Sequence, residues 1–119
     1  MKRIYKMGFQ LLSQCKARFP VACIVETERG LYRGFDIEIG PREAWVCAER
    51  VAISSALLED DFSFKKIYLF SKFPIYPCPL CWEWIASLFP GEGELHLLSP
   101  GSVFIQRIGG GKVVRGSLA

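Results

Sequence analysis

The chain has 119 residues, of which 50% are hydrophobic and 23% are charged, and its formal net charge is +3. This length and composition predict one globular domain with a real core rather than a disordered chain. So mild a charge does not predict a nucleic-acid-binding domain, which usually clusters many Lys and Arg residues. No apolar run reaches the roughly 18 residues that a membrane-spanning helix needs.

The sequence begins Met-Lys-Arg, as many secretory signals do, but polar residues at positions 6, 10, 14 and 16 interrupt the apolar stretch that such a signal requires. We therefore expect a cytoplasmic protein. Its 5 cysteines are an odd number, which argues against a disulfide framework. In a reducing compartment, their thiols are free for metal or redox chemistry.

The first third of the chain predicts a helix followed by a hairpin. Residues 4–18 carry apolar side chains every three to four positions, which is the period of an amphipathic helix, and Phe19-Pro20 ends it. Residues 21–26 are a continuous apolar run rich in β-branched side chains, typical of a buried strand. Residues 31–37 return as a second strand after a turn at Gly30.

Helices and strands alternate along the rest of the chain. Residues 43–58 contain strong helix formers with apolar positions spaced for a buried face, and residues 78–89 predict another helix that Pro90-Gly91 stops. Further strands are predicted at residues 64–70, 94–98 and 103–108.

This element order predicts an α/β fold, a three-layer α/β/α sandwich with a mixed sheet of about five strands. No internal repeat or long linker divides residues 1–119, so we expect a single domain. The glycine run at 109–111 and the polar end predict that residues 109–119 form a flexible tail.

Three cysteines and a glutamate lie at the starts of two predicted helices. Cys47 and Glu49 lie early on the first helix, and Cys78 and Cys81 open the second in a Pro-Cys-x-x-Cys motif. A catalytic zinc ion takes three protein ligands and one water, and helix N-termini favour thiolates. Glu49 can lie beside the metal without binding it and take a proton from that water. The pattern predicts a Zn²⁺ held by Cys47, Cys78 and Cys81.

The motifs resemble those of zinc deaminases of the cytidine deaminase superfamily. Gly34-Phe35-Asp36-Ile37-Glu38 precedes Cys47-Ala48-Glu49-Arg50 at the distance that separates Gly-x-Asn-x-Glu from Cys-Ala-Glu-Arg in free-nucleoside cytidine deaminases. Phe19-Pro20-Val21 resembles their Phe-Pro-Val segment, so the similarity runs from about residue 19 to about residue 90. It implies a zinc-dependent hydrolase that converts cytidine or deoxycytidine to uridine or deoxyuridine and releases ammonia.

The resemblance also implies a role for each matching residue. Glu49 would carry protons to the ring nitrogen and to the leaving ammonia. Phe19 would pack on the nucleoside, Glu38 would accept a hydrogen bond from a ribose hydroxyl, and Ala48 would offer its backbone to the base. Asp36 replaces the family's Asn, and two carboxylates there suit hydroxyl donors and repel a phosphate. Family members are often dimers or tetramers, so we expect a homo-oligomer with a small nucleoside substrate, and neither a nucleic-acid nor a membrane partner.

Two regions depart from the family pattern. Trp82 and Glu83 follow the Cys-x-x-Cys motif, where the family has Arg and Gln. That Arg offsets the negative charge of three thiolates on Zn²⁺, so Arg50 or the helix dipoles would have to compensate. The C-terminal family motif has an aromatic side chain that reaches a neighbouring subunit's site, and residues 97–100 followed by Phe104 resemble it only loosely.

Other interpretations of these residues stay open. A closed structural zinc site would take a fourth ligand from Cys15, Cys23 or His96, but it gives no reason for Glu49. The same chemistry could serve a blasticidin-type nucleoside, a guanine-type base or a base in nucleic acid. The chain could also be a non-catalytic zinc-binding relative that acts as a binding or assembly module.

The tryptophans could stack bases, but aromatic side chains on helices belong more often to a core or an interface, which we expect of Trp45, Trp82 and Trp84. Trp84 and Phe89 are consistent with a subunit interface. We expect Cys15 and Cys23 to be small buried hydrophobic residues and His96 to be a packed or edge strand residue.

Overall fold

The computed structural model describes residues 2–110 and 113–116. The helices are α1 (Lys2–Gln14), α2 (Ala48–Leu58) and α3 (Pro79–Leu88), and a 3-10 turn forms η1 (Arg42–Ala44). The strands are β1 (Val21–Thr27), β2 (Gly30–Phe35), β3 (Phe64–Ser71), β4 (Glu94–Ser99), β5 (Ser102–Arg107) and β6 (Val113–Gly116). No helix in the described part of the chain is long and apolar enough to cross a membrane.

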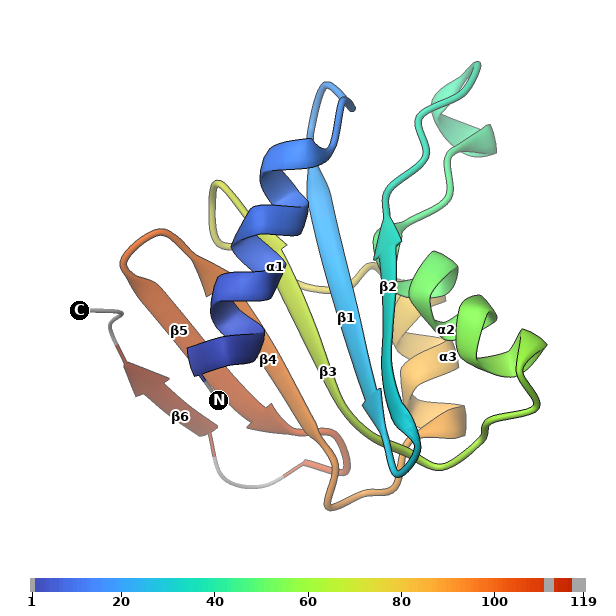
Figure 1. Ribbon diagram of the computed structural model, residues 1–119, viewed down its shortest axis with the longest axis vertical. Coiled ribbons are helices and arrows are strands. Elements are labelled where there is room, and N and C mark those ends of the chain that lie inside the picture. The colour runs from blue at the N-terminus through green and yellow to red at the C-terminus, as the bar shows by residue number, and fades with distance from the viewer. Residues whose placement is uncertain (1, 111–112, 117–119) are drawn as a thin grey trace.

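The strands form one mixed sheet in the order β2-β1-β3-β4-β5-β6. β3 and β4 pair in parallel, and the other neighbouring strands pair antiparallel. α1 lies on one face of the sheet, and α2 and α3 lie on the other (Figure 1). This arrangement confirms the predicted three-layer α/β/α sandwich.

The sheet has a sixth strand that the sequence did not predict. Residues 113–116 form β6 because they pair with β5, so the prediction of a flexible tail was wrong for these residues. Residues 111–112 and 117–119 of the predicted tail lie outside the described residues.

β1 divides the core into two halves. Ala22 and Ile24 belong to the cluster beneath α1, whereas Cys23 and Val25 belong to the cluster beneath α2 and α3. Successive side chains of a strand point to opposite faces, so a continuous apolar run belongs in the centre of a covered sheet. Cys23 is fully buried, as expected, and Cys15 is half-buried.

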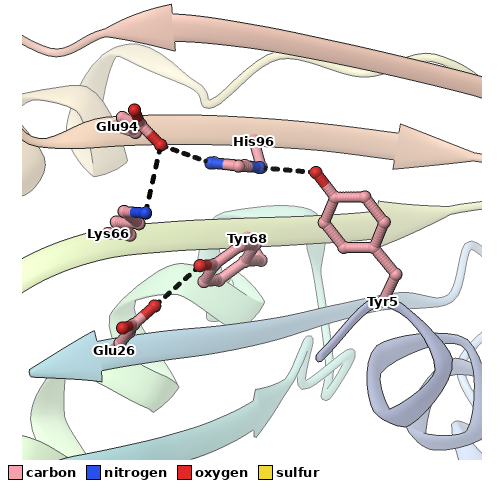
Figure 2. A network of polar contacts seen from close by, with 6 residues as sticks. All are labelled: Tyr5, Glu26, Lys66, Tyr68, Glu94 and His96. Carbon is pink, nitrogen blue, oxygen red and sulfur yellow. Dashed lines mark hydrogen bonds and ion pairs between the residues drawn. The ribbon is translucent and has the colours of Figure 1, made fainter. Parts of the chain in front are cut away.

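A buried polar network joins α1 to the sheet on the face that α1 covers. The Tyr5 hydroxyl lies 2.8 Å from His96 Nδ1, and the other ring nitrogen of His96 lies 2.9 Å from a Glu94 oxygen (Figure 2). Lys66 Nζ lies 3.5 Å from the same oxygen. His96 is fully buried, so both of its ring nitrogens need these partners.

α1 is shorter than predicted, because it ends at Gln14 and not at residue 18. The following segment bends so that the backbone N–H groups of Arg18 and Phe19 donate to the Glu38 carboxylate, at 2.9 and 3.1 Å. These tertiary hydrogen bonds take the place of further helical ones, which local periodicity cannot reveal.

The predicted helix 43–58 is also interrupted. It begins as η1, and α2 starts only at Ala48. Between the two, Val46 exchanges backbone hydrogen bonds of 2.8 and 3.0 Å with Ile37. This bridge holds the chain extended up to Cys47, which becomes the N-cap of α2.

Phe89 does not belong to an exposed surface, so its predicted place at a subunit interface was wrong. It is 5% exposed and packs on Phe64 with 4.8 Å between ring centroids. The residue is the C-cap of α3 and has an extended backbone. That conformation turns the side chain from the helix surface into the core. Trp84 is half-buried against the same core cluster.

Candidate active site

The starts of α2 and α3 bring three thiols together. Cys47 is the N-cap of α2, Cys78 is the N-cap of α3, and Cys81 lies in the first turn of α3. The Sγ atoms of Cys47 and Cys78 lie 3.8 Å apart, and those of Cys78 and Cys81 lie 3.4 Å apart. All three sulfurs lie within 4.8 Å of one another.

These sulfurs fit a zinc ion. Four ligands around a tetrahedral zinc with Zn–S bonds of about 2.3 Å lie about 3.8 Å from one another. The observed sulfur separations are close to this value and much longer than a disulfide bond. Neither Cys15, Cys23 nor His96 joins the cluster in the described chain. The three thiols are a donor set that fits zinc.

Electrostatics at the start of α2 favour thiolate. The hydrogen bond with Cys81, together with the Arg50 guanidinium 3.8 Å from Cys47 Sγ, lowers the pKa of Cys47 to about 5. The same hydrogen bond raises the pKa of Cys81 above that of a free thiol. The positive end of α2 adds to the preference of Cys47 for thiolate.

Arg50 occupies the place expected of a compensating cation. Its Nη2 donates to Cys47 Sγ, whereas its buried Nε has no hydrogen-bond partner in the described chain. Trp82 instead packs its ring against Tyr76, with 5.8 Å between centroids. Arg50, the Arg of the Cys-Ala-Glu-Arg motif, is therefore the guanidinium beside the cluster, and Trp82 brings no charge where the family has its other Arg.

Glu49 lies in the first turn of α2, beside the thiols, and is 4% exposed. Burial, with the nearby Cys47 charge as a further contribution, raises the pKa of Glu49 to about 7. A carboxyl group in this position exchanges a proton readily near neutral pH.

Gly34 on β2 allows α2 to come this close to the sheet. A Cβ atom at residue 34 would lie 2.6 Å from both the Ala48 carbonyl oxygen and the Ala52 amide nitrogen. Because both atoms are backbone, only glycine lets the first turn of α2 rest on β2. This contact places Cys47 and Glu49.

A cavity of about 240 Å³ opens beside the cluster. It brings together every residue to which the sequence assigned a role, except Cys81, which is buried behind it. Those that line it are Phe19, Asp36, Glu38, Cys47, Ala48, Glu49 and Cys78.

Asp36 and Glu38, two of the three carboxyl side chains that line the cavity, are held by backbone groups. Glu38 accepts hydrogen bonds from the N–H groups of Arg18 and Phe19. Asp36 Oδ1 accepts one from Val21 N–H at 2.9 Å, and partial burial raises the pKa of Asp36. Phe19 itself is 57% exposed, so its ring is free to contact a ligand at the mouth of the cavity.

Sequence reasoning missed several walls of the cavity. Arg42, Trp45, Ile75 and Tyr76 also line it. Trp45 follows η1 outside any α-helix and is only half-buried, so its predicted place in the core on a helix was wrong. The Arg42 guanidinium lies 5.3 Å from the centre of its ring. Two of these residues could have been predicted from the sequence. Ile75 and Tyr76 come just before Pro77-Cys78, and residues next to a predicted metal ligand are expected to lie close to the site.

Comparisons with solved structures agree with this fold. Cytidine deaminase from Burkholderia pseudomallei superposes with a TM-score of 0.83 at 24% identity, over 91% of this chain and 92% of that chain. Cytidine deaminase from Mycobacterium leprae gives 0.69 at 20% identity, over 87% and 88% of the two chains. The enzyme from Mycobacterium tuberculosis gives 0.66 at 15% identity, over 76% and 82%. At these identities the likeness establishes the fold.

The sequence itself was compared with curated proteins and with family models. No curated protein matches it significantly. Residues 2–91 match the family described as the cytidine and deoxycytidylate deaminase zinc-binding region. This match covers most of the chain and includes all three clustered cysteines and Glu49. The chain therefore belongs to the cytidine and deoxycytidylate deaminase family.

Proposed function

We propose that this protein is a zinc-dependent hydrolase that removes the exocyclic amine from a nucleoside base, with cytidine or deoxycytidine as substrate and uridine or deoxyuridine as product. One observation carries the proposal. A buried carboxyl group, Glu49, shares a cavity of about 240 Å³ with a cluster of three thiols that fits zinc. A closed structural site has no use for either the cavity or the carboxyl group.

Cys47, Cys78 and Cys81 would hold the ion. When bound, zinc supplies Lewis acidity towards water, which is the nucleophile of a hydrolytic deamination. Arg50 would support the thiolates, because its Nη2 lies 3.8 Å from Cys47 Sγ, and it is not among the residues that line the cavity.

Glu49 would move the protons. Its carboxylate accepts one proton from the attacking water and delivers it to the ring nitrogen next to the reacting carbon. Glu49 would then take the second proton from the hydroxyl group that the water left on the carbon and pass it to the amine. The carbon–nitrogen bond breaks as that hydroxyl becomes the carbonyl of the product, and ammonia leaves. Burial at 4% exposure keeps bulk water away from this group, so the protons stay within the site.

The opposite side of the cavity would hold the nucleoside. Asp36 and Glu38 would accept hydrogen bonds from sugar hydroxyls, and their backbone partners already fix their orientation. Phe19 would pack on the nucleoside from the mouth of the cavity, and the Ala48 backbone would face the base. Preoriented acceptors of this kind reduce the entropy lost on binding.

We also propose that the protein works as a homo-oligomer, a dimer or a tetramer. Large apolar side chains project into solvent near the two helices on the active-site face of the sheet. Leu58 is 85% exposed and Leu80 is 64% exposed. Apolar groups this exposed are typical of surfaces that another chain covers.

A second candidate keeps the chemistry and changes the substrate. Asp36 adds a second carboxylate where the resembling deaminases have an amide, which favours a sugar with more hydroxyl or cationic donors than ribose. A blasticidin-type nucleoside is one example, whereas a guanine-type base or a nucleic-acid base draws no support from Asp36.

The test is ammonia release by the zinc-loaded protein, with cytidine, deoxycytidine, cytosine, a blasticidin-type nucleoside, adenosine, guanine and a cytosine-containing oligonucleotide as substrates. The matched control is Glu49→Gln, which keeps the shape of the side chain. We expect turnover of cytidine or deoxycytidine and a loss of about 10² to 10⁴-fold in the control, with zinc content unchanged. Full activity of Glu49→Gln would refute the assigned role, and silence on every substrate with zinc bound would favour a non-catalytic binding module.

A further inference from the structure

Tyr76 stands between two cavities. It lines the active-site cavity of about 240 Å³, and it also lines a neighbouring cavity of about 340 Å³ beside β4 and β5. Ile75 is the other residue common to both. The two cavities therefore meet at Ile75 and Tyr76.

The ring of Tyr76 is held from two sides although it is 51% exposed. Its hydroxyl donates to Gln106 Oε1 on β5 at 3.1 Å. Its ring lies 5.8 Å from that of Trp82 on α3, at an angle of 36°. An exposed aromatic side chain that is fixed at both its tip and its face presents a wall of constant shape to the cavity.

The wall lies next to the reacting centre. Tyr76 is two residues before Cys78, and both line the active-site cavity together with Glu49. A base that places its amine-bearing carbon between the thiols and Glu49 must therefore have an edge or face near the Tyr76 ring. This step rests on the function proposed above.

We propose that Tyr76 is a specificity-determining residue, which closes the active-site cavity on the side of β4 and β5 and limits it to a single-ring base. The space behind the ring suits a second ring. Its lining includes the apolar side chains of Leu97 and Phe104 and the hydroxyl-bearing Ser99. Apolar walls with a few polar groups are what a heteroaromatic ligand needs. Without the Tyr76 ring, Ile75 is the residue left between the two cavities, and the added space would admit the second ring of a purine.

The experiment compares Tyr76→Ala with Tyr76→Phe, which keeps the ring and loses only the hydrogen bond to Gln106. Phe73→Ala is the matched control, because Phe73 is a 74% exposed aromatic residue of the same loop that lines neither cavity. For each zinc-loaded variant, kcat and KM are measured for cytidine, and adenosine is measured both as a substrate and as a competitive inhibitor.

We expect Tyr76→Ala to lower the inhibition constant of adenosine relative to the KM of cytidine by about 10 to 100-fold, the range that pocket size alone can supply. Tyr76→Phe and Phe73→Ala should keep the wild-type ratio. The inference is overturned if Tyr76→Ala keeps this ratio within about twofold of wild type, or if Tyr76→Phe relaxes it as much as Tyr76→Ala does.

Failure of the proposed function gives a different result. In that case the wild-type protein turns over no cytosine nucleoside, and the wall is tested by calorimetric binding of cytidine and adenosine to the zinc-loaded proteins. Adenosine binding that strengthens in Tyr76→Ala and not in Tyr76→Phe supports the wall, and equal binding to all variants overturns it.

Discussion

Replacing Gly34 by alanine should disturb both the fold and the metal site. The added Cβ would lie 2.6 Å from two backbone atoms of α2, whereas ordinary contacts begin at about 3.4 Å, so helix and strand must separate by about 0.8 Å. The first turn of α2 carries Glu49 and follows Cys47, while Cys78 and Cys81 belong to α3 and do not move with it. The substitution therefore changes the separation of the sulfurs as well as the packing.

We expect Gly34→Ala to lower the free energy of unfolding by about 1 to 3 kcal/mol, the usual cost of overpacking. Displacement of a catalytic group by about 1 Å can cost about 100-fold in rate, so kcat/KM should fall by a similar factor. Urea unfolding of the metal-free protein gives the first quantity. Competition with a chromogenic chelator gives the zinc affinity, which should also fall.

The matched control is Gly91→Ala, since a Cβ there meets its nearest atom at 3.7 Å, an ordinary contact. If Gly34→Ala unfolded at the same urea concentration as Gly91→Ala and bound zinc as tightly, the close approach of α2 to β2 would not position the site, and the reasoning would fail.

Two further predictions follow from the cysteine cluster and from the network under α1. Cys78→Ala should lose zinc, measured by metal analysis of the purified protein, and with it the stabilisation that a metal bound only to the folded state supplies. Cys15→Ala should keep one zinc per chain, because Cys15 lies outside the cluster; zinc loss from both variants alike would contradict the ligand assignment. Tyr5→Phe should lower the free energy of unfolding by about 1 to 3 kcal/mol, because the buried His96 loses a hydrogen-bond partner. Its kcat and KM should match the wild type, since the network lies on the face of the sheet opposite α2 and α3; an altered kcat would show that the two faces are coupled.

The sequence by itself determined the order of the main elements and singled out the three cysteines that the fold brings together. Periodicity of 2 or 3.6 residues is local, so β1, β3 and α3 could be read from their own residues. The Pro-Cys-x-x-Cys motif predicted that Cys78 and Cys81 lie together at a helix start, and the position of Cys47 before a second predicted helix suggested the third thiol. The three-layer fold followed from the alternation of elements.

Contacts between separate segments decided the rest. The bridge between Ile37 and Val46 broke the predicted helix 43–58, and pairing with β5 turned part of the predicted tail into β6. The periodicity within a segment is silent on both, because each is stabilised by backbone groups of another segment. The walls of the cavity depend on tertiary structure for the same reason. The sequence places Tyr76 two residues before Cys78, but the direction of its ring depends on contacts with Trp82 and Gln106, which no spacing in the sequence predicts.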